Sequence, residues 1–197
     1  MIEIEGKDIE KAQKKLAGIK FGIEKALSAT INHALGKVKT GIKKTVRAEY
    51  YIKNKDVEKT LKVKKASKSL LTGTIVSTST RTAISKFAVT KGRKGIKVAI
   101  SKKEGRKLLQ GKPNLYGRPF TAIVRNKHLG VFQRKTANGI RLEKGKWKSP
   151  MKELYTISIP EMLGNKNIQE YVKEEAAKLI PERLDHEIER ILRGIKW

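Results

Sequence analysis

Three histidines and a few carboxylates are the side chains of this sequence that could carry catalysis or hold a metal. His33 lies within a helical pattern, where packing against a neighbouring element is the commoner role. His128 falls in a predicted hairpin turn, where exposure to solvent is the default. Near His186, Asp185 and Glu189 are four residues apart and share a helix face, as ligands of a divalent cation would. Such pairs are common on amphipathic helices, so the sequence predicts no metal and no cofactor.

No complete catalytic motif accompanies these residues. The sequence has no HExxH, no GxSxG and no GxxxxGK[ST], and the Gly-rich phrase at 91–95 lacks both the spacing and the following Ser or Thr of a phosphate-binding loop. The absence of cysteine excludes disulfides, thiolate metal sites and a Cys nucleophile. The basic part of the chain has five carboxylates, and no close pair of them suggests two-metal nuclease chemistry. These are Glu49, Asp56, Glu58, Glu104 and Glu143. The sequence therefore predicts a protein that is not an enzyme.

Positive charge is the strongest feature of the composition. The 197 residues include 46 Lys+Arg and 19 Asp+Glu, a formal net charge of +27. Residues 36–148 hold 32 basic and 5 acidic side chains, whereas the segments before and after carry net charges of +1 and −1. A Lys-rich surface kept for solubility would explain scattered charge, but it explains this segregation less well. We therefore expect contact with a polyanion, either nucleic acid or an acidic protein surface.

The basic stretch 102–118 is predicted to be a long loop, and residues 136–149 form a second basic excursion from the sheet. With the segment at 91–94 they supply the residues that we expect to face an anion or an acidic partner. These are Lys91, Arg93, Lys94, Lys102, Lys103, Arg106, Lys107, Lys144, Lys146 and Lys148. Lys is a point charge suited to phosphates, and Lys greatly outnumbers Arg, the usual reader of bases. Any binding to DNA is thus expected to lack sequence preference and to weaken steeply with salt.

The elements that position these residues follow from hydrophobic periodicity. A spacing near 3.7 from Ile9 to Val46 predicts a long N-terminal helix, which either bends at Gly36 or Gly41 or projects towards a neighbour. A second helix begins at about Asn167 and should be kinked or split near Pro181. Alternation predicts strands at 61–66, 95–101 and 154–159, and a β-branched, nearly uncharged composition predicts one at 72–80. A further strand is predicted at 83–89, and a hairpin pairs 120–125 with 130–135.

The order of these elements predicts an α+β fold: a long N-terminal helix, an antiparallel sheet with basic loop insertions, and a kinked C-terminal helix. We expect one domain over 1–197, with the long helix in 1–50, the basic sheet region in 51–160 and the C-terminal helix in 161–197. No apolar run is long enough to span a membrane, and the acidic N-terminus lacks the apolar core of a secretory signal. The sequence therefore predicts a soluble protein with no membrane partner.

Taken together, the elements resemble the prophage minor tail protein Z family, the tail-completion proteins of long-tailed phages. The resemblance covers nearly the whole chain and rests on four features. The first is the helix ending in LSATINHALGKVKTGIKKTVRAEYYI, followed by the passage KNKDVEKTLKVKKAS, and the second is the basic interruption of the sheet. The third is the hairpin FTAIVRNKHLGVFQRKT, which contains Phe132, Gln133 and Arg134. The fourth is the segment LYTISIPEML, which precedes a helix containing Pro181.

The resemblance implies a structural virion protein that completes the head-proximal end of the tail and allows head–tail joining. It implies other copies of the chain as partners, in a ring with six copies favoured. It also implies a tail terminator, tail tube or neck protein, and double-stranded DNA whose end lies in the tail lumen. The location implied is the virion tail, with the host cytoplasm during assembly.

Two other hypotheses remain open from the residues alone. One is a free, non-specific nucleic-acid-binding protein of nucleoid or ribosome-associated type, which binding to linear duplex at low salt would support. The other is a nuclease or other phage enzyme, whose only obvious candidate residues are Glu104, His128 and Glu143.

Overall fold

The computed structural model describes residues 6–124, 127–137, 140–141, 147–148 and 150–194. The chain divides into two compact units. The helical unit comprises residues 1–45, 58–78 and 163–197, and the strand-rich unit comprises residues 46–57 and 79–162. The fold has helices at both ends and antiparallel sheets between them, which confirms the predicted α+β class.

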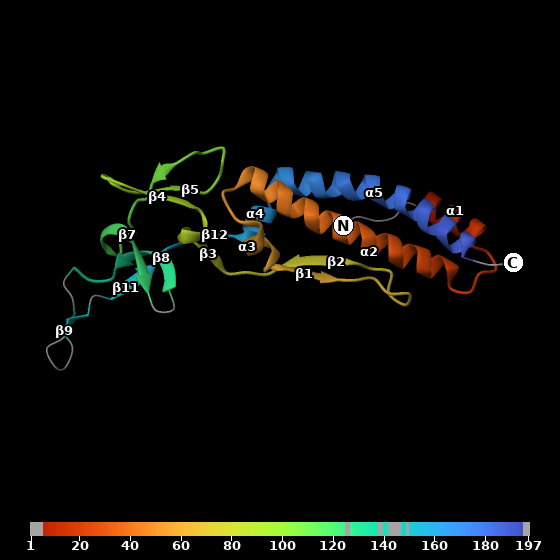
Figure 1. The fold of residues 1–197 in the computed structure, drawn as a ribbon, viewed down its shortest axis with the longest axis horizontal. Coiled ribbons are helices and arrows are strands. Elements are labelled where there is room, and N and C mark those ends of the chain that lie inside the picture. The colour runs from red at the N-terminus through yellow and green to blue at the C-terminus, as the bar shows by residue number, and fades with distance from the viewer. Residues whose placement is uncertain (1–5, 125–126, 138–139, 142–146, 149, 195–197) are drawn as a thin grey trace. The chain divides into compact units, whose positions relative to one another are not determined.

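Three helices form the body of the helical unit. They are α1 (Gly6–Lys15), α2 (Gly22–Glu49, whose last four residues belong to the strand-rich unit) and α5 (Lys166–Arg193). Helices α2 and α5 lie side by side over much of their length, and α1 packs against the C-terminal part of α5 (Figure 1). Their apolar cluster consists of Ala12, Leu16, Ala26, Leu27, Leu184 and Ile188.

The predicted N-terminal helix is broken, but not at the glycines that we expected to bend it. Helix α1 ends at Lys15, and the chain reverses through a turn in which Gly18 has φ +85° and Phe21 has φ +58°. This reversal lets Leu16 pack with Leu184 in one cluster, which a straight helix of this length could not do. Burial of a leucine side chain contributes about 1.5–3 kcal/mol to the free energy of unfolding, which favours the reversal of the chain.

Gly36 and Gly41 are both accommodated within a continuous α2. At Gly41 a Cβ atom would lie only 2.6 Å from the Tyr171 ring of α5, so the glycine permits a close approach of the two helices. Gly41, which we expected to bend the helix, thus serves the packing of α2 against α5.

Helix α5 runs without a break from Lys166 to Arg193, so Pro181 does not split it. Asn165 caps its start, because its side chain accepts a hydrogen bond from the amide of Asn167 at 3.1 Å. Two buried neighbours, Ile180 and Leu184, hold the helix on the core around the proline. Packing therefore overrides the local tendency of proline to end a helix.

Pro181→Ala is expected to raise the free energy of unfolding by about 1–2 kcal/mol, because it restores a helical hydrogen bond at an exposed position. Chemical denaturation of the full chain measures the change. Ala177→Ser, also exposed on α5, serves as the control that should change stability little. A destabilised Pro181→Ala chain would mean that packing requires the geometry that proline imposes.

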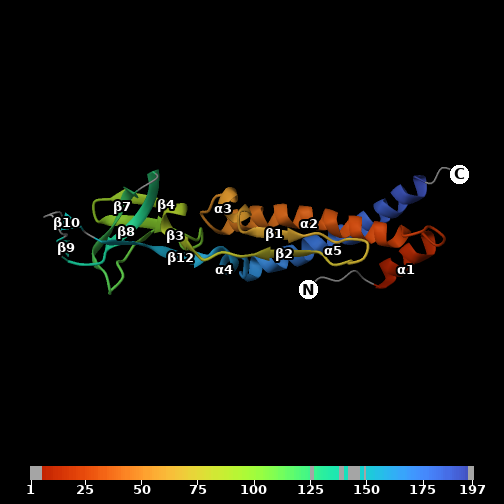
Figure 2. The ribbon, with the colours of Figure 1, turned by 90° about the horizontal axis from the view of Figure 1, so that it is seen from below.

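A two-stranded ribbon completes the helical unit. Strand β1 (Leu61–Lys64) pairs antiparallel with β2 (Thr74–Ser77), and both strands lie within segments predicted to be strands. The ribbon lies along α2 in both views (Figures 1 and 2), and the Asn32 side chain exchanges two hydrogen bonds with the backbone of Ala66, at 2.8 and 2.9 Å. A Cβ atom at Gly73 would lie 2.6 Å from Leu35, so this glycine allows the ribbon to approach the helix.

In its described residues, the strand-rich unit contains four small antiparallel sheets in place of one larger sheet. Their strands are β3 (Arg81–Ala83) with β12 (Tyr155–Ser158), β4 (Ala88–Gly92) with β5 (Gly95–Ala99) and β6 (Lys107–Leu108), β7 (Tyr116–Val124) with β8 (His128–Arg134) and β11 (Met151–Glu153), and β9 (Ile140–Arg141) with β10 (Trp147–Lys148). A short helix, α3, spans Asn54–Glu58, and its last residue belongs to the helical unit.

Several strand predictions hold and two are wrong. The β5 strand, the β7–β8 hairpin and β12 all lie where alternation predicts them. The segment 83–89 is not one strand, because a 3-10 turn (Ile84–Lys86) separates β3 from β4 and turns the chain between two sheets. The predicted loop 102–118 contains β6 and the first residues of β7, since short pairings with β5 and β8 order it.

The strand β12 passes directly into α4 (Ile159–Leu163). Ser158 and Glu161 form a capping box: the Ser158 amide donates to the Glu161 carboxylate at 2.7 Å, and the Glu161 amide donates to the Ser158 hydroxyl at 3.3 Å. Pro160 near the first helical position suits this start, which is why the strand ends there.

Candidate anion-binding surface

The sheet β4–β5–β6 carries most of the predicted anion-facing residues. Strands β4 and β5 are joined by a two-residue turn at 93–94, closed by the pair Gly92 and Gly95, and Gly95 has φ +129°, a conformation that favours glycine. Ile96 and Val98 are buried and fix the sheet on the core of the unit. The turn therefore carries Arg93 and Lys94 at the end of a sheet whose inner side chains are buried.

The structure brings seven of the ten predicted residues to this sheet and its connections. All seven are exposed: Lys91, Arg93, Lys94, Lys102, Lys103, Arg106 and Lys107. Lys144 and Lys146 lie outside the described residues, and Lys148 is described only as part of the β10 backbone.

Three of the seven side chains already have partners in the chain. Lys103 pairs with Glu49 at 3.3 Å, and Lys107 pairs with Glu104 at 2.8 Å. The Lys102 ammonium lies 5.7 Å from the centre of the Tyr51 ring.

The other four, Lys91, Arg93, Lys94 and Arg106, have no ion pair or hydrogen bond within the described part of the chain. They are the cations of this sheet most available to an external anion.

Sequence patterns missed two contributors to this surface. Arg118, with Lys94, lines an open hollow of about 530 Å³ whose walls include Ile96, Leu108 and Pro119. Lys97 is exposed on β5, opposite Thr90 and Leu108. The alternation within β5 does not distinguish Lys97 as a candidate site residue. Its position on this surface follows only from the pairing of β5 with β4 and β6.

A buried glutamine organises the chain between β6 and β7. Gln133, 1% exposed on β8, accepts a hydrogen bond from the Lys112 amide at 2.8 Å and donates to the carbonyls of Lys112 and Gly117 at 3.3 and 2.9 Å. A Cβ atom at Gly111 would lie 2.5 Å from the Gln133 amide nitrogen, so glycine is needed beside it. Gln133 thus orders the segment that carries Arg118.

Gln133→Leu is expected to lower the free energy of unfolding by about 1–2 kcal/mol, because it leaves the three backbone groups without their partner while keeping the apolar volume. We also expect faster amide hydrogen exchange at residues 111–117. Gln110→Leu, an exposed position in the same segment, is the matched control. Unchanged exchange at 111–117 in the Gln133 variant would show that the glutamine does not order the segment.

Several side chains considered for catalysis or metal binding contact another ionisable side chain. Glu153 Oε1 lies 2.9 Å from His128 Nε2, Asp185 pairs with Lys11 at 2.7 Å, and Glu189 pairs with Arg193 at 3.1 Å. Glu143 lies outside the described residues. No group of three or more His, Cys, Asp or Glu side chains suited to a metal occurs in the described ranges.

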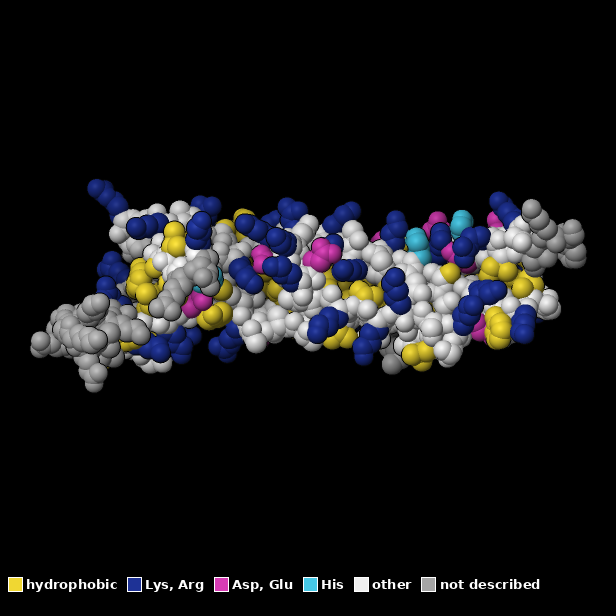
Figure 3. Space-filling model, turned by 60° about the horizontal axis from the view of Figure 1, so that its bottom comes forward, with side chains coloured by type: hydrophobic (Ala, Val, Ile, Leu, Met, Phe, Trp, Pro, Cys, Tyr) yellow, Lys and Arg dark blue, Asp and Glu magenta, His cyan; other side chains and the backbone are white. Residues whose placement is uncertain are grey.

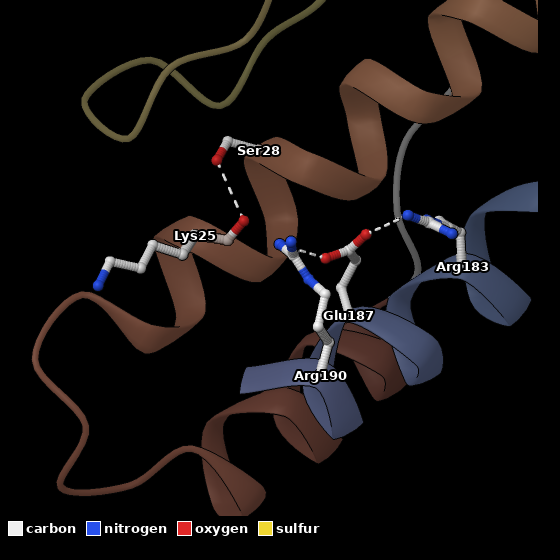
Figure 4. Close-up of polar contacts among 5 residues, drawn as sticks. All are labelled: Lys25, Ser28, Arg183, Glu187 and Arg190. Carbon is white, nitrogen blue, oxygen red and sulfur yellow. Dashed lines mark hydrogen bonds and ion pairs between the residues drawn. The ribbon is translucent and has the colours of Figure 1, made fainter. Parts of the chain in front are cut away.

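Polar groups also lie between the helices of the helical unit. Glu187, 1% exposed on α5, is flanked by Arg183 at 2.5 Å and by Arg190 at 2.7 Å (Figure 4). The first contact is a hydrogen bond, whereas the second is an ion pair without hydrogen-bond geometry. Burial, followed by the charges of Arg183 and Lys37, lowers the pKa of His33 on α2.

Cations are not confined to the β4–β5–β6 sheet. In Figure 3, Lys and Arg side chains lie over both units on the face drawn. On β1, Lys62 and Lys64 are exposed, and on α2 Lys39 and Lys43 flank Glu58 at 3.2 and 3.4 Å. Both cations donate hydrogen bonds that lower the pKa of the Glu58 carboxyl. None of the helices in the described ranges is long and apolar enough to cross a membrane.

Helices at both chain ends, small antiparallel sheets and exposed cations over both units define an α+β protein with a broad cationic surface. The family model described as prophage minor tail protein Z (GPZ) matches residues 6–196, and the chain therefore belongs to this family. It is a structural minor tail protein of the phage virion, with tail proteins as its partners. Neither the curated proteins nor the solved structures gave a match to the chain.

Proposed function

We propose that the protein completes the head-proximal end of the phage tail and allows the tail to join the filled head. In this role it lies in the virion next to a tail terminator, tail tube or neck protein, after assembly in the host cytoplasm. The proposal draws on family membership for the tail and on the charge distribution for the position within it.

The observation that carries the proposed position is the set of exposed, unneutralised cations on β4–β5–β6. Lys91, Arg93, Lys94 and Arg106 lack an acidic partner in the described ranges, so their charge is available for an external anion. Within a tail, the end of the double-stranded DNA supplies phosphates, and neighbouring rings can supply carboxylates. Because single Lys and Arg side chains contact phosphates without reading bases, the DNA contact lacks sequence preference.

Other copies of the chain are the further partners that we propose, as a ring with six copies favoured. A closed ring would place the same cationic surface at each position around the tail axis. Mass measurement of the purified protein, with low-resolution imaging, distinguishes a ring from a monomer.

The decisive test is electron microscopy of particles produced without this protein. We expect filled heads and full-length tails that remain unjoined, with the chain supplied in trans restoring joined, infectious particles. Normal infectious particles without the protein would overturn the proposal. Joined particles that fail to deliver DNA would also contradict the joining role, while leaving a contact with the DNA end.

A further inference from the structure

The three-stranded sheet β11–β8–β7 exposes apolar side chains on both of its faces. Directly paired residues share a face, so the register places Phe120, Phe132 and Glu153 on one face and Thr121 and Val131 on the other. An antiparallel sheet at a protein surface normally has one apolar and one polar face. In this sheet, apolar side chains remain exposed on both faces, so both are open to a partner.

The first face includes residue types that are enriched at protein interfaces. Tyr116 is 51% exposed and Met151 is 40% exposed, and both pair with Arg134 of β8. The Arg134 guanidinium lies 5.9 Å from the centre of the Phe120 ring. Aromatic residues, Met and Arg are enriched at protein interfaces and Lys is depleted, whereas Lys dominates the rest of this chain.

A mostly buried carboxylate lies within this same face. Glu153 accepts a hydrogen bond from the Tyr155 hydroxyl at 2.9 Å and contacts His128 at 2.9 Å, which fixes both side chains. Its hydrogen bond raises the pKa of Tyr155. Because a carboxylate repels phosphate, this face suits a protein better than DNA.

The second face extends beyond the core at the hairpin end. Val131 and Gln133 are each 1% exposed, but the next pair along this face, Ile123 and Leu129, is 72% and 55% exposed. Ile123 is the most exposed large apolar side chain in the described ranges. Figure 3 shows apolar side chains among cations over the strand-rich unit.

We propose that this sheet, here called the docking sheet (β7, β8 and β11), inserts into an apolar groove of another tail protein whose rim carries carboxylates. Exposed Lys127, Lys135 and Lys152 border the apolar side chains and complement such a rim. A second copy fits this sheet less well, because the three lysines would meet a strand-rich unit with 24 basic and 6 acidic side chains. The proposed ring would then form through other surfaces of the chain. The inference rests on the proposed role in the tail and names the surface that meets the protein partner.

The test measures binding of the full-length chain to tails purified from particles that lack it. Two double variants remove one face each: Tyr116→Ser with Met151→Ser, and Ile123→Ser with Leu129→Ser. The matched control, Leu70→Ser with Val76→Ser, alters side chains of the β1–β2 ribbon that are 62% and 40% exposed. Co-sedimentation gives the half-saturating concentration, and circular dichroism with thermal unfolding verifies that each chain folds.

Each face variant is expected to raise the half-saturating concentration about tenfold or more, while the control stays within about twofold of the parent. Face variants that fold and bind like the parent would overturn the docking sheet and leave the proposed function intact. Failure of the parent chain itself to bind tails would instead contradict the proposed function.

Two further measurements distinguish other occupants of the sheet. Sedimentation that shows self-association lost in the face variants would overturn the assignment in favour of a second copy. Weaker binding of the face variants to a linear DNA duplex would overturn the assignment to a protein partner in favour of nucleic acid. Unchanged self-association and DNA binding, with weakened tail binding, support the proposal.

Discussion

Glu187→Ala is expected to lower the free energy of unfolding by about 2–3 kcal/mol. The Glu187 carboxylate is 1% exposed and balances Arg183 and Arg190 on the same helix. Removal of one member of a buried pair costs about 3–5 kcal/mol because the remaining charge is uncompensated. Since the two arginine side chains are 29% and 62% exposed and retain some hydration, we expect a value below that range.

A second ion pair of α5 supplies the control. Glu189 pairs with Arg193 at 3.1 Å with the same spacing of four residues, but both side chains are largely exposed. Glu189→Ala should therefore change stability by no more than about 0.5 kcal/mol. Urea denaturation of the full chain, followed by circular dichroism at 222 nm, measures both changes. Equal effects of the two substitutions would show that burial does not strengthen the Glu187 interactions.

Paired replacement separates charge from packing at this position. Arg183→Met with Glu187→Met removes both charges and keeps apolar volume. This double variant should recover most of the stability lost in Glu187→Ala, because apolar replacements of buried ion pairs are often neutral or stabilising. The pair has a structural role in the fold and lies in the helical unit, whereas the candidate anion-binding surface lies in the strand-rich unit.

Helices and strands with strong periodicity were predictable from the sequence. The apolar spacing of α2 and α5, and the alternation of β5 and of the β7–β8 hairpin, depend on contacts that repeat along each element. The class of fold follows from their order. Such patterns report which side of an element is buried, but not which other element covers it.

The errors arise where long-range packing decides the backbone. The reversal between α1 and α2 places Leu16 on the cluster containing Leu184, a contact that periodicity cannot reveal. Gly41 faces Tyr171, so a glycine that locally weakens a helix instead allows two helices to approach. Strand β6 has two residues and depends on pairing with β5, which explains why its segment resembles a loop in sequence.

The candidate surface was predictable in its residue types but not in its geometry. Charge segregation identified the lysines around the β4–β5 turn, and their exposure agrees with it. Neutralisation of Lys103 by Glu49 depends on two segments separated by about fifty residues. The role of Gln133 likewise depends on the segment at 111–117, to which no local pattern connects it.

Removal of four cations from β4–β5–β6 is expected to produce the largest change in DNA binding. In a variant with Lys91, Arg93, Lys94 and Arg106 all replaced by Gln, the four side chains with no partner in the described ranges lose their charge. Each phosphate contact contributes a slope of about −0.9 to the dependence of log K on log salt. If all four contact phosphates, the slope for linear duplex becomes less steep by about 3–4.

Affinity at low salt should fall by several orders of magnitude in this variant, because each neutralised phosphate releases counterions. The control replaces Lys7, Lys14, Lys15 and Lys25 by Gln, which removes the same charge from exposed positions of the helical unit. Fluorescence anisotropy with one duplex at 50, 100 and 200 mM salt measures both slopes. An equal loss of DNA affinity in the two variants would mean that the total charge of the chain, and not this surface, governs DNA binding. An unchanged slope in the first variant would show that its four cations do not contact phosphates and would contradict a DNA contact by this surface.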